Sequence, residues 1–140
     1  IFMIKLIVGT KGTGKTKTMV AQANAAVETS KGNVVFVEKG MGVRHELSNN
    51  VRLVDTEEFD IRGFDKFTGF LSGILASNYD ITHLFVDGTF KIGSKEKNYE
   101  GLANMILHLA KVAPQDTEIV FSVSCAAEDL PSSLQHFAVK

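Results

Sequence analysis

Short apolar runs of strand length recur along the chain, separated by stretches in which apolar residues return at helical spacing. Most of these runs are apolar throughout, as strands of a parallel sheet covered on both faces tend to be. Strands are therefore predicted over residues 3–8, 33–38, 51–54, 81–87 and 118–124, with a last edge strand at 137–139.

Three amphipathic helices are predicted between these strands. The first follows residue 16 and carries apolar residues at Met19, Val20, Ala23, Ala26 and Val27. The second presents Phe67, Phe70, Leu71, Ile74 and Leu75 on one face. The third presents Leu102, Ile106, Leu109 and Ala110 and stops by Pro114.

Two shorter helical starts are also predicted. Asp55 is followed three residues later by Glu58, a spacing that resembles a capping box and predicts a helical turn. Asp129-Leu130-Pro131 has a proline in the first turn, which is typical of a helix start.

The alternation of strands and helices predicts an α/β fold with an open, mostly parallel sheet covered by helices on both faces. The length predicts a single domain over residues 1–140. Right-handed crossovers bring the carboxyl ends of the strands to one edge, where a ligand crevice is expected. The loops at that edge are 9–16, 38–50, 87–99 and 124–130.

Composition and charge limit the partners and the cellular location that we expect. Hydrophobic residues make up 44% and charged residues 22% of the chain, which is ordinary for a globular protein. A net charge of −1 argues against general nucleic-acid binding. Cys125 is the only cysteine, so we expect no internal disulfide and a cytoplasmic location. No apolar run reaches membrane-spanning length, so no membrane insertion is expected. Ile1-Phe2 is interpreted as a cloning remnant ahead of a natural start at Met3.

The loop after the first predicted strand carries the strongest chemical signal. Gly9-Thr10-Lys11-Gly12-Thr13-Gly14-Lys15-Thr16 fills every fixed position of G-x-x-x-x-G-K-[ST], the phosphate-binding P-loop. Its glycines let successive backbone N–H groups face one concavity, and the following helix adds its positive amino end. The predicted nucleotide-binding residues are Gly9, Thr10, Lys11, Gly12, Thr13, Gly14, Lys15, Thr16 and Thr18.

Two of these residues have predicted roles of their own. Lys15 is expected to reach the β- and γ-phosphates and to act in catalysis, and the Thr16 hydroxyl is expected to bind Mg²⁺. A second Mg²⁺ residue is predicted at Asp87, which ends an apolar strand. An aspartate at a strand end is also an ordinary turn starter, so Asp87 depends on the P-loop for this interpretation.

The residue that follows Asp87 is Gly88, where many related ATPases have a glutamate that orients the attacking water. Rapid hydrolysis by the isolated chain is therefore not expected. Glu38, at the end of the second strand, is the best acidic substitute by position. Arg44, in the loop after that strand, is the preferred candidate for stabilising transition-state charge. The alternative for both is an ordinary surface charge.

Three further groups have two interpretations each. Ser122 and Ser124 either sense the γ-phosphate or make ordinary hydrogen bonds at a strand end. The aromatic cluster of Phe59, Phe64, Phe67 and Phe70 is either a pocket for a base or core packing. Lys91, Lys95 and Lys97 either contact a phosphate-bearing partner or are solvated in a loop.

The chain resembles a group of small bacterial P-loop proteins along its whole length. The resemblance rests on Ile4-Lys5-Leu6-Ile7-Val8-Gly9, the glycine loop itself, Lys31-Gly32-Asn33-Val34-Val35-Phe36, Tyr79-Asp80-Ile81, Val86-Asp87-Gly88 and Asp129-Leu130-Pro131. Such proteins are described as ATP-binding or, by distant similarity, as twitching-motility ATPases. The chain also looks like a minimal RecA-type or thymidine-kinase core, which implies a three-layer sandwich binding ATP or ADP with Mg²⁺.

Three functions remain open from the sequence. The first is a slow or partner-activated ATPase that acts as a nucleotide switch, with an unidentified protein partner or self-association. The second is a binding module that does not hydrolyse nucleotide and only orders its loops around it. The third is a small-molecule phosphotransferase, although no lid-sized insertion is present. A GTPase is disfavoured because the chain has no N-K-x-D motif.

Overall fold

The computed structural model describes residues 3–94 and 96–139, so the interpretation of Ile1-Phe2 and the expectation for Lys95 lie outside the described residues. The strands are β1 (Ile4–Gly9), β2 (Asn33–Glu38), β3 (Val51–Asp55), β4 (Ile81–Val86) and β5 (Glu118–Ser124). The α-helices are α1 (Lys15–Thr29), α2 (Phe64–Ser77), α3 (Thr89–Gly93) and α4 (Tyr99–Val112), with 3₁₀ turns at η1 (Thr56–Phe59), η2 (Ala127–Asp129) and η3 (Ser132–Phe137).

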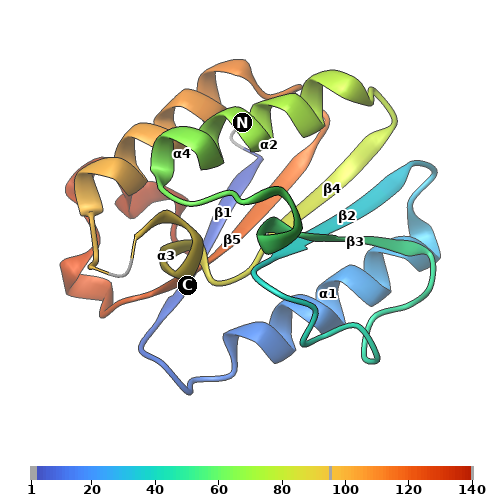
Figure 1. Ribbon diagram of the computed structural model, residues 1–140, viewed down its shortest axis with the longest axis horizontal. Coiled ribbons are helices and arrows are strands. Elements are labelled where there is room, and N and C mark those ends of the chain that lie inside the picture. The colour runs from blue at the N-terminus through green and yellow to red at the C-terminus, as the bar shows by residue number, and fades with distance from the viewer. Residues whose placement is uncertain (1–2, 95, 140) are drawn as a thin grey trace.

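The five strands form one open sheet in the order β1-β5-β4-β2-β3, and every pair is parallel. The predicted α/β fold and parallel sheet are thus confirmed. All five carboxyl ends lie at one edge. There, β5 separates β1 and its glycine loop from β4 and Asp87 (Figure 1).

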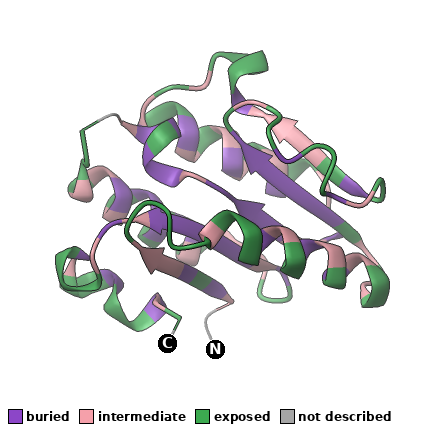
Figure 2. Ribbon diagram, turned by 90° about the horizontal axis from the view of Figure 1, so that it is seen from below, coloured by how far each residue is buried: buried purple, intermediate pink, exposed green. Residues whose placement is uncertain are grey.

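Helices cover the sheet on both faces, with α2 and α4 on one face and α1 on the other (Figure 1). The larger core lies under α2 and α4, and Cys125 is fully buried in it. The smaller core packs Met19 and Ala23 of α1 against Phe36, Phe85 and Val120 of the sheet. The strands at the centre of the sheet are accordingly the most buried part of the ribbon in Figure 2.

Three local expectations need correction. Residues 87–99 are not all loop, because α3 forms at Thr89–Gly93 and buries Phe90 and Ile92 in the core. The helical turn predicted at Asp55 does form, as η1, and Asp55 caps it by accepting from the Glu57 N–H; only the reciprocal bond of a capping box is not found between these described residues. Residues 137–139 make a single bridge to β1, between Leu6 and Ala138, instead of a strand.

No described helix combines the length and the apolar character needed to cross a membrane.

Candidate functional site

The glycine loop joins β1 to α1 and takes the shape that its glycines allow. Gly12 and Gly14 have φ angles of +86° and +87°, a region in which a side chain is strained. Gly9 has a different reason to be glycine, because an added Cβ would lie 2.7 Å from Thr13 Oγ1. Thr13 in turn donates to the Thr10 carbonyl at 2.8 Å, so the loop is fixed by its own contacts.

Lys15, the first residue of α1, folds back over this loop. Its Nζ donates to the Thr10 carbonyl at 3.0 Å. Burial lowers the pKa of Lys15, and the carboxylate of Asp87 partly opposes that shift. The ammonium group is therefore held at the concave side of the loop, near a carboxylate.

Thr16 and Asp87 meet although 71 positions separate them in the chain. The Thr16 hydroxyl donates to Asp87 Oδ2 at 2.9 Å. The other carboxylate oxygen, Oδ1, accepts from the Ser122 hydroxyl at 2.6 Å, and that hydroxyl accepts from the Gly88 N–H at 2.7 Å. The fold thus brings the two predicted Mg²⁺ residues together at the carboxyl edge of the sheet.

Ser122 holds Asp87 from the neighbouring strand. It is only 2% exposed, and its hydrogen bonds go to Asp87 and Gly88. Ser122 is therefore a positioning residue for the carboxylate, which favours the strand-end interpretation. Ser124 is partly exposed and lines the open space in front of the glycine loop.

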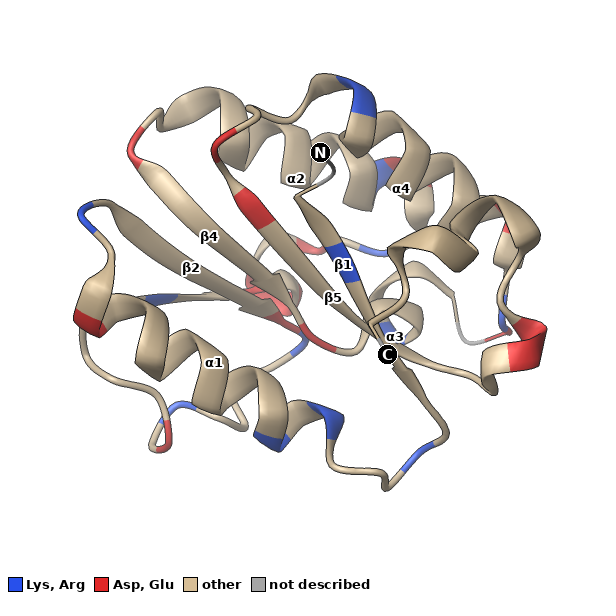
Figure 3. Ribbon diagram, turned by 180° about the vertical axis from the view of Figure 1, so that it is seen from behind, with Lys and Arg blue, Asp and Glu red and all other residues tan. Residues whose placement is uncertain are grey.

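A cavity of about 930 Å³ opens over this cluster. It runs from the glycine loop along α1 to the turn after β2, and the described residues that line it include Gly12, Lys15, Thr16, Asp87 and Ser124. Lysines lie on the glycine loop, at the start of α1 and in α3, and these segments are blue in Figure 3. The volume is within the range of small-molecule sites.

Glu38 lies next to Asp87 in space, because β2 pairs with β4 and the Asp87 N–H donates to the Val37 carbonyl at 2.8 Å. It is 8% exposed, and its Oε2 accepts from the Val43 N–H at 3.2 Å. Burial raises the pKa of Glu38, the Val43 bond opposes this, and the charges of Asp87 and Asp55 add to it. Its carboxylate anchors the loop after β2 and does not line the cavity.

Arg44 lies in the same turn and is exposed. Its neighbours Gly42 and Val43 line the cavity, but Arg44 is not among the described lining residues. Thr18 is exposed on α1, and its hydroxyl donates to the Gly14 carbonyl at 3.1 Å. Neither side chain is therefore among those that line the cavity over the glycine loop.

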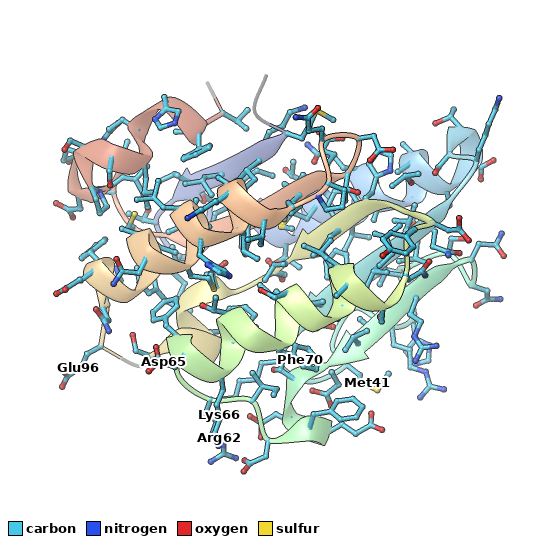
Figure 4. All side chains as sticks on the ribbon, turned by 90° about the horizontal axis from the view of Figure 1, so that it is seen from above. Met41, Arg62, Asp65, Lys66, Phe70 and Glu96 are labelled. Atoms are coloured by element: carbon cyan, nitrogen blue, oxygen red, sulfur yellow. The ribbon has the colours of Figure 1, made fainter. Side chains whose placement is uncertain are left out.

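The phenylalanine cluster does not form a base pocket. Phe64 and Phe67 are buried in the core under α2. Phe59 is 57% exposed and packs on Phe70, with ring centroids 5.9 Å apart. Figure 4 labels Phe70 on the flank of α2. None of the four is among the residues that line the cavity over the glycine loop.

A second cavity of about 810 Å³ adjoins the first. The two share Lys11, Gly88, Lys91 and Ser124. The second is otherwise lined by Thr10, Lys39, Gly40, Glu57, Phe90, Ser94 and Lys97. Lys91 and Lys97 thus face a cavity and are not simply part of a solvated loop.

Sequence reasoning missed the far wall of the first cavity. Lys17, Val20, Ala21 and Asn24 lie along α1, and their spacing of three and four residues marks one side of a helix. Asn24 donates to the Glu46 carbonyl at 2.9 Å and accepts from the Ser48 N–H at 2.7 Å, so it ties this helix to the turn after β2. The spacing of these four residues could have predicted from the sequence that this side of α1 lines the cavity.

No protein-family model matches the sequence, and no curated protein matches it significantly. In residues 3–94 and 96–139, no three His, Cys, Asp or Glu side chains are grouped as a metal site.

Proposed function

We propose that the chain is a P-loop NTPase domain that binds Mg-ATP and acts as a slow or partner-activated ATPase, switching between nucleotide states. The observation that carries this proposal is the hydrogen bond of Thr16 Oγ1 to Asp87 Oδ2 beneath the glycine loop. A glycine turn without a ligand has no need of a carboxylate from a distant strand at this point.

The donor set fits Mg²⁺. Thr16 offers a hydroxyl oxygen and Asp87 a carboxylate oxygen, the hard ligands that this ion prefers. Ser122 holds Asp87 Oδ1 by a hydrogen bond and leaves Oδ2 for Thr16 or the ion. When bound, Mg²⁺ neutralises charge on the β- and γ-phosphates. Lys15 and the loop N–H groups bind the phosphate chain, and burial of Lys15 strengthens that contact.

Slow hydrolysis follows from the acidic residues available. Of the described residues that line the first cavity, Asp87 and Glu46 are the only acidic ones. Asp87 is already bonded by Thr16 and Ser122, and Glu46 lies on the turn beside the far part of α1. Glu38 is adjacent but bonded to the Val43 N–H. A partner, or a rearrangement of the loop after β2 that frees Glu38, would supply the missing base.

The strand order supports a RecA-type core as the finer fold class. The glycine-loop strand and the Asp87 strand are not neighbours, because β5 lies between them. We assign the three-layer arrangement of α1, sheet and α2–α4 to this class. The basis is the glycine loop on β1 together with Asp87 at the end of β4.

Nucleotide-dependent thermal shift tests the proposal. Mg-ATP is expected to raise the melting temperature of the wild-type chain, since a ligand that binds only the folded state stabilises it. Lys15→Ala is expected to abolish most of the shift, because it removes a charge-assisted contact worth about 1.5–3 kcal/mol. Lys31→Ala, an exposed lysine at the opposite edge of the sheet, is the matched control and should retain the shift.

Phosphate release on the same samples separates the candidate functions. We expect turnover far below the ~10 per second of a typical enzyme. A shift with no turnover at all would favour the non-hydrolysing module, and turnover only with a small-molecule acceptor would favour the phosphotransferase. No shift with any Mg-nucleotide would contradict all three.

A further inference from the structure

The second cavity gathers several lysines, of which the proposed nucleotide site uses only Lys11. Among the described residues, four lysines line it, at Lys11, Lys39, Lys91 and Lys97, against the single carboxylate of Glu57. The whole chain has a net charge of −1, so this is a local concentration of positive charge. Like charges gathered in one place repel one another, and an anionic ligand relieves that repulsion.

The lysines come from four separate segments. Lys11 lies in the glycine loop, Lys39 follows β2, Lys91 lies in α3 and Lys97 precedes α4. The fold, and not a run of charge in the sequence, brings them to one cavity. Gly88 adopts a φ angle of +67°, which turns the chain after Asp87 into α3 and so aims Lys91 at both cavities.

The carboxylate of Glu57, the single acidic group in the described lining, is already neutralised. Glu57 pairs with Arg62 at 3.2 Å and with Lys39 at 3.8 Å. Within the part of the chain that the structure describes, Lys11, Lys91 and Lys97 have no carboxylate within salt-bridge distance. Their charges are therefore available to a ligand.

The rest of the lining suits a compact organic anion. Phe90 contributes an apolar surface, and Thr10, Ser94 and Ser124 contribute hydroxyl groups. A volume of about 810 Å³ accommodates a molecule of sugar-phosphate size. The shared residues Lys11, Gly88, Lys91 and Ser124 place this cavity directly beside the one over the glycine loop.

We propose that this lysine-lined cavity binds a small phosphomonoester, positioned next to the terminal phosphate of the bound nucleotide. A phosphomonoester is close to a dianion at neutral pH, which matches several converging lysines better than a single carboxylate does. A nucleic-acid backbone would need basic residues along an extended surface, and the net charge of −1 disfavours that partner. The position beside the terminal phosphate rests on the proposed function, whereas the anion site itself does not.

The test uses backbone amide NMR of the full chain with glucose 6-phosphate as the probe and glucose as its neutral control. Ionic strength is held constant with sodium chloride. The titration is made on the free protein and on protein saturated with Mg²⁺ and a non-hydrolysable ATP analogue. Saturable shifts are expected at Gly40, Phe90 and Ser94, which line only the second cavity, and not at Asn24 or Gly42, which line only the first.

The second part of the test removes lysine charges from the second cavity. Lys39→Gln with Lys97→Gln removes two lysines that line only the second cavity. The double variant is expected to weaken glucose 6-phosphate binding about tenfold, while Lys31→Gln leaves it unchanged. Affinity for the ATP analogue should be the same in all three proteins.

Three outcomes would overturn the proposal. The first is the absence of saturable shifts with glucose 6-phosphate in either state. The second is equal binding of glucose, or tighter binding of an oligothymidylate at these residues. The third is a loss of nucleotide affinity in the double variant, which would make the cavity part of the nucleotide site. If the ATP analogue fails to bind, the proposed function fails alone, because the titration of the free protein still reports on the second cavity.

Discussion

At the scale of single residues, the site depends on contacts that bring distant positions together. Asp87 is bonded through both carboxylate oxygens, to Thr16 of the glycine loop and to Ser122 of the strand between them. The places of the glycine loop and of Asp87 at strand ends were predictable, because each follows an apolar run of strand length. The role of Ser122 was not, since a serine at a strand end gives no sign of which way its hydroxyl turns.

Glu38 gives a prediction about pH at this scale. Burial raises its pKa above the usual glutamate value of about 4.3, so the folded state binds its proton more tightly than the unfolded state does. The free energy of unfolding therefore falls as pH rises from the unfolded-state pKa of about 4.3 through the higher folded-state pKa. Above the folded-state pKa, the full destabilisation caused by burying the charged carboxylate is present. Glu38→Gln removes this cost, and its amide oxygen still accepts from the Val43 N–H.

Urea denaturation at a series of pH values checks this expectation. Relative to wild type, Glu38→Gln should be more stable at pH 7, with the difference shrinking as pH approaches 4. Glu28→Gln, an exposed residue on α1, serves as the control and should show no such trend. A Glu38→Gln protein that is less stable than wild type at pH 7 would contradict a raised pKa as the dominant effect.

At the scale of elements, two helices pack on one aromatic ring of a third. Gly93 of α3 and Gly101 of α4 both face Phe64 of α2. A Cβ added at Gly93 would lie 2.3 Å from the tip of the Phe64 ring. Close packing at this point sets the position of α3, and with it the position of Lys91 beside both cavities.

Gly93→Ala is accordingly expected to destabilise the chain by about 1–3 kcal/mol, because the buried ring cannot move aside without strain. Gly73→Ala on α2 is the matched control, since nothing lies within 4 Å of its added Cβ. It should stabilise the chain by about 0.5–1 kcal/mol, the usual gain of alanine over glycine in a helix. Equal effects in thermal or urea denaturation would show that Phe64 does not constrain Gly93.

Sequence periodicity predicted the longer elements because each buries a continuous apolar face. The apolar spacing within each strand and within each of the three longer helices was enough to predict that element. The helix α3 could not be predicted in this way, since five residues are too few to show a helical period. It forms because Phe90 and Ile92 find places in a core built by other segments.

At the scale of the whole molecule, the topology explains why four segments converge on one edge. All strands are parallel, so their carboxyl ends lie at one edge of the sheet. The glycine loop follows β1, a turn follows β2, α3 follows β4, and β5 ends at the same edge. Two adjoining cavities result, one over the glycine loop and one lined by lysines. The first could be predicted from the glycine loop and the fold class. The second could not, because its lysines are scattered in sequence and meet only in the folded chain.

The most direct test of the central claim is isothermal titration calorimetry of the wild-type chain with a non-hydrolysable ATP analogue, in excess Mg²⁺ and again in EDTA. We predict saturable binding of one nucleotide per chain with a Kd below about 1 mM. We also predict binding at least about tenfold weaker in EDTA, because Thr16 and Asp87 then have no ion to share with the phosphates. Absence of binding heat, or equal affinity with and without Mg²⁺, would contradict the account.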